Sequence, residues 1–382
     1  MKDAIASPIH QARTLVGVAT ICLALAAPAG ALAAVHGRGG SGEAFLPPHH
    51  RIFHGVTDTG SVRDFHVFDH RVGAHSALLE SFGRWGGKHL GAGLHRWRVT
   101  HTRGVLSLST APGGKPELIS PRRIARGFGD RYILRLGRTI AHSGQVVYIR
   151  LFPEMNGHWN PYCAFNADGS SRGGSHSTQA FRNAWRRIVL IVRGGKLRAV
   201  NRKLSTLGMP RIYRASSNRD PVYSQRRVPA VLPRPRVAFM WVPQTIGSPD
   251  LRANAPGRYW PGARYVDWIG ADIYSAFATP GVWSAFKRFY EHWGNPHRHH
   301  WPFAVGEYSP WNNDYRGAFT RRLFDWARHH KRVRALVYYR SVTADNPFDI
   351  NHWPRARAVL RSELNRHRFA PYAPGTRRPA AP

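Results

Sequence analysis

The stretch VVYIRLFPEMNGHW, residues 146–159, decides how the rest of the chain is interpreted. Its first half is rich in β-branched and aromatic residues, a composition typical of a buried strand. The strand then runs into a polar turn that carries Glu154, Asn156 and Trp159. A buried strand with an ionisable group at its carboxyl end is the arrangement of barrel enzymes, whose chemistry lies where strands run into loops.

A second stretch, PFAVGEY at residues 302–308, repeats the pattern of an apolar strand that ends in a glutamate. Glycoside hydrolases use a pair of carboxyl groups that flank the bond they cleave. Two glutamates at the ends of two strands, each beside aromatic residues, therefore predict hydrolysis of a glycosidic bond.

These residues carry a resemblance to a known family. The string Glu154-Met155-Asn156-Gly157-x-Trp159, followed by a distant Gly306-Glu307, resembles glycoside hydrolase family 26, the β-mannanase and β-glucanase family. The resemblance extends from about Arg51 to about Leu364. It implies a retaining, endo-1,4-β-mannanase-like enzyme with Glu154 as acid/base and Glu307 as nucleophile, and with no metal or other cofactor.

The remaining hydrophobic pattern agrees with an α/β fold. Eight apolar runs are expected as strands: the opening stretch and residues 52–56, 77–82, 105–109, 237–242, 268–274, 302–307 and 335–339. Helices are expected at residues 90–99, 177–193, 282–293, 317–330 and 353–364, with Ser177 as an N-cap. Strands that alternate with helices indicate a parallel sheet, and eight strands in 382 residues fit a single-domain (β/α)8 TIM barrel.

Three segments stand apart from this barrel domain, which is expected at residues 51–366. Residues 34–50 are rich in Gly, Pro and His and are expected as a flexible lead-in, and residues 367–382 as a disordered tail. Residues from about 194 to 235 carry many Arg and Pro with no clear period. They indicate a basic insertion over the surface, where an anionic contact is expected.

The N-terminus has the pattern of a secretory signal peptide, residues 1–33. Lys2 and Arg13 precede an apolar run, and Ala31-Leu32-Ala33 matches an A-x-A cleavage site. This predicts an extracellular or periplasmic protein; an uncleaved anchor is the alternative, although the run is short for a membrane span. Cleavage would leave Cys163 as the only cysteine, so no internal disulfide is expected and its thiol is expected to be buried.

The charge of the chain is strongly positive, +35 from 56 basic and 21 acidic residues. Such a field attracts polyanions such as nucleic acid, anionic membranes and acidic polysaccharides. The arginines are scattered and do not form a stripe interleaved with aromatic residues, so no nucleic-acid partner is expected. Two interpretations stay open: a solvated, Arg-biased surface, which is favoured, and a specific anionic partner such as a cell-surface polymer. A monomer is expected.

Further residues near strand ends are expected to serve the substrate cleft. Trp159 is expected to form a sugar-stacking surface, whereas Asn156 is expected mainly to brace the loop. Asp272 and Tyr274 end the sixth strand as D-x-Y. In the family this tyrosine donates a hydrogen bond to the nucleophile, and Arg150 and Arg340 are further candidate donors.

The fifth and eighth strands contribute four more candidates. Trp241 and Gln244 lie at the end of the fifth strand and are expected in the cleft. Tyr339 and Arg340 occupy the place where the family usually has Trp-Arg, so the stacking face of the central sugar subsite is expected to be smaller.

The substrate follows less directly from the sequence. Mannanases of the family have a histidine before the acid/base, where this chain has Pro153. That histidine contacts the sugar, so a related β-glucan or an exopolysaccharide, including an anionic one, is considered beside β-mannan. A non-catalytic binding protein for polysaccharide or cell envelope on the same barrel is the competing class. The histidines at positions 297, 299 and 300 have no acidic or thiol partner nearby in sequence, which favours a solvated loop over a metal site.

Overall fold

Eight parallel strands close on themselves in the computed structural model, which describes residues 43–87, 90–111, 116–212, 228–294, 299–340 and 347–376. The strands, in the order of their pairing, are β1 (Ile52–Thr57), β2 (Leu78–Arg84), β3 (Arg103–Ser109), β4 (Val146–Leu151), β7 (Arg236–Trp241), β8 (Trp268–Tyr274), β9 (Phe303–Ser309) and β10 (Val333–Tyr338). Pairing of β10 with β1 closes the barrel. The expected single-domain (β/α)8 barrel is confirmed.

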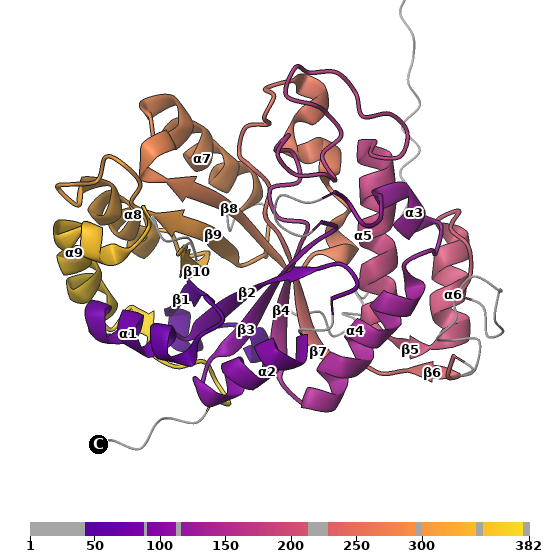
Figure 1. Cartoon of the computed structure of the whole chain (residues 1–382), viewed down its shortest axis with the longest axis horizontal. Coiled ribbons are helices and arrows are strands. Elements are labelled where there is room, and N and C mark those ends of the chain that lie inside the picture. The colour runs from indigo at the N-terminus through magenta and orange to yellow at the C-terminus, as the bar shows by residue number, and fades with distance from the viewer. Residues whose placement is uncertain are drawn as a thin grey trace, which may run out of the picture. The chain divides into compact units, whose positions relative to one another are not determined.

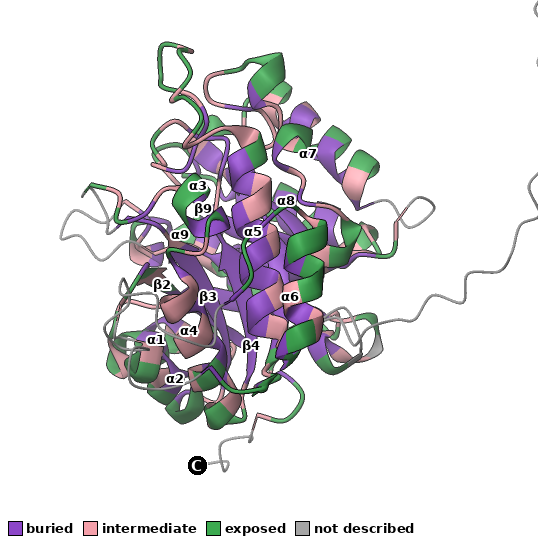
Figure 2. Ribbon diagram, turned by 90° about the vertical axis from the view of Figure 1, so that its right-hand side faces the viewer, coloured by how far each residue is buried: buried purple, intermediate pink, exposed green. Residues whose placement is uncertain are grey.

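Helices surround these strands, as Figure 1 shows. They are α1 (Val62–Val72), α2 (Leu90–Val99), α3 (Pro121–Ala125), α4 (Asp130–Ser143), α5 (Thr178–Arg193), α6 (Leu197–Thr206), α7 (Pro280–Trp293), α8 (Ala318–His329) and α9 (Pro354–Leu364). Figure 2 shows buried residues on the side of α5 and α6 that faces the strands and exposed residues on the outer side of α6. Within the residues that the structure describes, no helix has both the length and the apolar character needed to cross a bilayer.

Side chains along each strand point alternately into the barrel and toward the helices, and they form two hydrophobic clusters. One fills the barrel interior and includes Phe53, Tyr148, Met240 and Trp268. The other lies between strands and helices. Because successive side chains of a strand point to opposite faces, a residue that follows an interior one points toward the helices.

The ends of the domain differ from expectation. Part of the expected lead-in forms two short 3-10 helices, Glu43–Phe45 and Pro48–His50, and Phe45 packs in the interior cluster. Phe369 and Ala370 form β11, which pairs with β1, in place of the disordered tail expected from residue 367. Burial of Phe45 and Phe369 explains why both segments are ordered. Residues 1–42 and 377–382 lie outside the described residues.

The basic insertion also contains regular structure. Leu197, Val200 and Leu204 are buried at helical spacing in α6, so the expectation of a segment without periodicity is wrong for this part. Strands β5 (Gly195–Lys196) and β6 (Val231–Leu232) pair in an antiparallel sheet of two strands. Residues 213–227 of the insertion lie outside the described residues.

Candidate active site

A cavity of about 1530 Å³ opens at the carboxyl ends of the strands. Its lining contains glutamates from the loop after β4 and from β9, together with Asp272 of β8. Many aromatic side chains share the wall: Phe82, Tyr132, Trp159, Tyr162, Tyr274, Phe277, Trp311, Tyr339 and Phe348. A hollow of this size exceeds the common range for small-molecule sites, which suits a chain-like ligand.

The backbone beside the cavity is unusual on both sides of Pro153. Phe152 and Glu154 have φ angles of 51° and 50°, a left-handed conformation that costs non-glycine residues energy. The Phe152 side chain is fully buried, and the amide of Glu154 donates to the carbonyl oxygen of Val242 at 2.9 Å. These contacts hold the strained turn and direct Glu154 toward the cavity.

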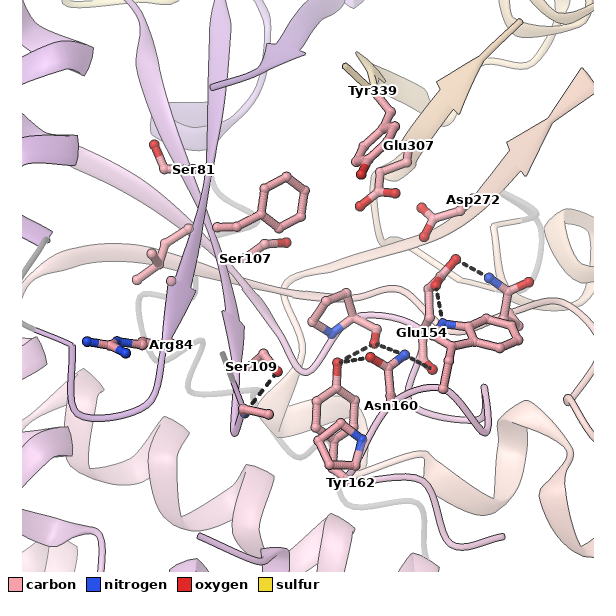
Figure 3. A pocket seen from close by; sticks show the side chains of 18 of the residues that line it. Ser81, Arg84, Ser107, Ser109, Glu154, Asn160, Tyr162, Asp272, Glu307 and Tyr339 are labelled. Carbon is pink, nitrogen blue, oxygen red and sulfur yellow. Dashed lines mark hydrogen bonds between the residues drawn. The ribbon is translucent and has the colours of Figure 1, made fainter. Parts of the chain in front are cut away.

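Two neutral donors contact the half-buried carboxyl group of Glu154. Trp159 donates from its indole nitrogen to Oε2 at 3.0 Å, and Gln244 donates from its amide to Oε1. Figure 3 shows both contacts. The glycine of the motif permits this arrangement, because a Cβ atom on Gly157 would lie 2.5 Å from the Trp159 ring.

An irregularity in β9 directs Glu307 into the barrel. On β9, Val305 and Tyr308 pair with Ala271 and Ile273 of β8, so β9 contains one extra residue between these pairs. Bulges of this kind redirect side chains near functional sites. The adjacent glycine is required as well, because a Cβ atom on Gly306 would lie 2.7 Å from an oxygen of Asp272.

Glu307 is held by two donors from different strands. Arg150 of β4 donates to Oε1 through Nη1, and the hydroxyl of Tyr274 donates to Oε2. The Glu307 side chain is 10% exposed and lines the cavity. One face of its carboxyl group is therefore fixed, while the group remains accessible to a ligand.

Arg150 is the centre of a buried charge cluster. Besides Glu307 it contacts Asp272 through Nη2 and Glu80 of β2 through Nη1, the latter at 3.1 Å. Burial lowers the pKa of Arg150, but the three carboxyl groups outweigh burial and raise the pKa well above its usual value. The guanidinium is therefore a permanent cation in the floor of the site.

Too many carboxyl groups surround this one cation for all to be ionised. Burial, followed by the nearby charge of Glu307, raises the pKa of Glu154 to about 7. Burial also raises the pKa of Glu80 to about 7 and that of Asp272 well above its usual range. At neutral pH and below, Glu154 can therefore hold a proton while Glu307 is held by two donors.

Replacing Tyr274 by Phe is expected to lower kcat about 10- to 100-fold with little change in KM. The variant removes one hydrogen bond to a carboxylate, and such bonds contribute about 1.5–3 kcal/mol. Steady-state kinetics on the polysaccharide substrate would check this. Tyr315→Phe, at an exposed position, is the matched control. A Tyr274→Phe enzyme as fast as this control would contradict a role for the Tyr274 hydroxyl.

Glu80 leads to a prediction about stability. Its Oε1 accepts from Ser107 at 2.6 Å, whereas its Oε2 is buried without a hydrogen-bond partner among the described residues. The folded-state pKa of about 7 lies above the usual value of 4.5, so the folded state binds more protons between these pH values. Folding stability should therefore fall as pH rises from about 4.5 to about 7.

The Glu80→Gln variant should lose less stability than the wild type over this pH range, by about 1–3 kcal/mol, because it carries no titrating group there. Urea unfolding at pH 5 and pH 8 measures the difference. Equal pH dependence in the two proteins would show that folding does not raise the pKa of Glu80.

Three exposed aromatic residues mark the walls of the cavity. Phe82, Trp159 and Phe277 are 52%, 53% and 55% exposed, which is unusual for such large side chains. Tyr339 also lines the cavity, with its ring edge-on to that of Tyr274 at 5.9 Å between centroids. Rings that line an open cleft provide flat apolar faces on which the C–H faces of sugars can stack.

Two residues expected to touch substrate do not line the cavity. Trp241 follows the interior residue Met240, so it points outward, where it is fully buried against Trp260 and Trp293. Its assignment to the cleft is wrong. Arg340 is also misassigned, because its guanidinium donates to the backbone oxygens of Thr57 and Asp64, away from the cavity.

Asn156, expected mainly to brace the loop, does not line the cavity either. It is fully buried and exchanges two hydrogen bonds with the backbone of Gln244, at 2.9 and 3.0 Å. Its contribution is to hold the loop that carries Glu154, not to contact a ligand. Gln244 itself lines the cavity, as expected for it.

Two further expectations concern cysteine and metal. Cys163 is free and buried, as predicted, with its sulfur 3.7 Å from the hydroxyl of Tyr259. Over the described ranges, no group of three or more His, Cys, Asp or Glu side chains is arranged to hold a metal ion. His297 of the histidine cluster lies outside these ranges.

Comparisons with known proteins identify the fold. No model of a known protein family matches the chain, and no curated protein matches it in sequence. Solved structures do match. A Bacillus subtilis mannanase superposes with a TM-score of 0.50 at 12% identity, over 88% of this chain and 90% of the mannanase. A modular endo-β-1,4-mannanase of Cellulomonas fimi, of glycoside hydrolase family 26, superposes with a TM-score of 0.51 at 11% identity, over 84% of this chain and 72% of that one. The chain therefore has a fold like that of the family 26 mannanases.

Proposed function

We propose that this protein is a β-glycoside hydrolase that cleaves a β-linked polysaccharide in two displacement steps. Glu154 is the acid/base and Glu307 is the nucleophile. The observation that carries the proposal is the pair of carboxyl groups at one cavity wall in contrasting environments: neutral donors and a raised pKa at Glu154, a cation and a hydroxyl at Glu307.

In the first step the Glu307 carboxylate attacks the anomeric carbon, and the glycosidic bond breaks. Glu154 donates its proton to the departing oxygen, and a glycosyl–Glu307 ester forms. Arg150 and Tyr274 keep the attacking oxygens oriented. In the second step Glu154, now ionised, takes a proton from water, and that water attacks the anomeric carbon and releases Glu307. The product keeps the β configuration.

A raised pKa at Glu154 suits both steps. An acid with a pKa of about 7 is protonated at neutral pH or below, and its conjugate base accepts a proton from water in the second step. Activity should be lost as pH rises through about 7, because the acid is then ionised before the first step.

The proposed substrate is β-mannan or a related β-glucan. The fold supports β-mannan, because the two structures named above are described as mannanases. At Pro153 and Tyr339 the sequence differs from the usual family pattern. These two differences support contacts with the sugar that differ from those of the family's mannanases. We also propose that the protein is secreted, which is supported by the N-terminal sequence pattern.

The test is release of reducing ends from β-1,4-mannan and mixed-linkage β-glucan by the purified protein. We expect oligosaccharides from at least one polymer, with the first-formed anomer β by proton NMR. A protein that is retained on these polymers but releases no product would instead be a binding protein on the same barrel.

A further inference from the structure

The cavity continues beyond the carboxyl groups, over the carboxyl end of β2 and along α2. This extension, here called the distal arm, is lined by Ser81, Gly83, Arg84, Leu90, Gly93 and Arg96. In Figure 3, Arg84 lies across the view from Glu154, Asp272 and Glu307. A polymer bound at the carboxyl groups could therefore place further sugar units in the distal arm.

The charged residues of the cavity divide into two groups. Among the described residues that line it, all carboxyl groups lie in the catalytic cluster, at Glu154, Asp272 and Glu307. The other charged side chains in the lining are Arg84, Arg96 and Arg172. Away from the site of cleavage, the described part of the lining therefore has positive charge and no negative charge.

The three arginines differ in how far their charge is compensated. Arg96 pairs with Asp58 at 2.7 Å. Arg172 donates to neutral backbone oxygens, including that of Asn160 at 2.7 Å. Arg84 is exposed, and its guanidinium has neither an ion pair nor a hydrogen bond among the described residues. Of the three, Arg84 has all its donors free for a ligand.

A free guanidinium in the wall of a cleft suits a planar anion. It presents paired N–H donors that match the two oxygens of a carboxylate. Because low-dielectric walls focus the field of fixed charges, a cleft charge attracts an anion more strongly than a charge on an open surface does. The net charge of +35 adds a general attraction for a polyanion.

We propose that the distal arm is a subsite for an acidic sugar unit, whose carboxylate is bound by Arg84. The substrate class is then an anionic β-linked polysaccharide that contains uronate units. The inference about cleavage of such a polymer rests on the proposed function, whereas its binding can be measured independently.

The test uses two polymers that differ only in charge. One is β-1,4-glucomannan, and the other is the same preparation with part of its C6 hydroxyl groups oxidised to carboxylates. Dissociation constants are measured at low salt in a Glu154→Gln background, so that the polymers stay intact. The quantity compared is the preference, the ratio of the two dissociation constants.

The Glu154→Gln protein should bind the oxidised polymer more tightly than its parent. The double variant, which also carries Arg84→Gln, should show a preference about 5-fold smaller. High salt should also reduce it. Arg321→Gln, at an exposed position of α8, removes the same charge elsewhere and should change the preference less than about 2-fold. This control is needed because the chain has 56 basic residues.

The proposal is wrong if the oxidised polymer is bound no more tightly than its parent, or if Arg84→Gln and Arg321→Gln reduce the preference equally. Product release by the wild-type protein is measured separately. Retained preference without products from either polymer would overturn the proposed hydrolysis and leave the acidic subsite supported.

Discussion

Replacing Glu307 by Gln should abolish turnover, with kcat at least about 10⁴-fold lower than in the wild type. The amide has nearly the shape of the carboxylate but cannot form the glycosyl ester. Arg150 and Tyr274 both donate to this group in the wild type, so one of them would face the amide nitrogen in the variant. The measurement is release of reducing ends over hours at high enzyme concentration.

Binding separates lost chemistry from lost structure. The Glu307→Gln protein should bind polysaccharide within a few-fold of the wild type and unfold at a similar temperature. Asp325→Asn, at an exposed carboxylate of α8, is the control for removal of a charge and should keep its activity within about 2-fold. A Glu307→Gln enzyme that retains more than a tenth of wild-type kcat would exclude Glu307 as nucleophile.

The Glu154→Gln variant should lose about 10²- to 10⁴-fold in kcat on polysaccharide, the usual contribution of a general acid. The loss should depend on the leaving group. An aryl glycoside whose phenol is strongly acidic departs without protonation, so its first step should be nearly as fast as in the wild type. A burst of released phenol, followed by slow turnover, is the expected time course.

Azide gives a second readout for Glu154. A small anion needs no general base, so it should accelerate turnover of the aryl glycoside by Glu154→Gln and give a β-glycosyl azide. Slow release of phenol with no burst and no effect of azide would contradict the role of Glu154 as acid/base.

Much of the barrel was predictable because its strands are apolar and β-branched. All eight expected strands occur, and α2 has the expected bounds. Helix α1 was not anticipated, because its buried residues are only Phe65, Phe68 and Val72 among charged neighbours. Helix α6 was missed for the same reason, since its three apolar positions lie in an Arg-rich segment.

The site was less predictable, because sequence does not show which face of a buried strand points inward. Met240 and Trp241 are both buried, and only the register of β7 places the tryptophan outside. Glu80 and Ser81 are likewise adjacent and both buried, so the sequence does not show which of them points into the barrel. It therefore does not predict that Glu80 lies beside Arg150. The strand-end motifs at Glu154 and Glu307 were recognisable because a polar turn or a glycine directly adjoins each.

The most direct measurement of the central claim is mass spectrometry after reaction with a 2-deoxy-2-fluoro glycosyl fluoride, which slows hydrolysis of a glycosyl ester more than its formation. The peptide that contains Glu307 should gain the mass of one fluorosugar in the wild type and not in Glu307→Gln. A sugar attached to any other residue, or wild-type turnover of the reagent to the inverted product, would contradict it.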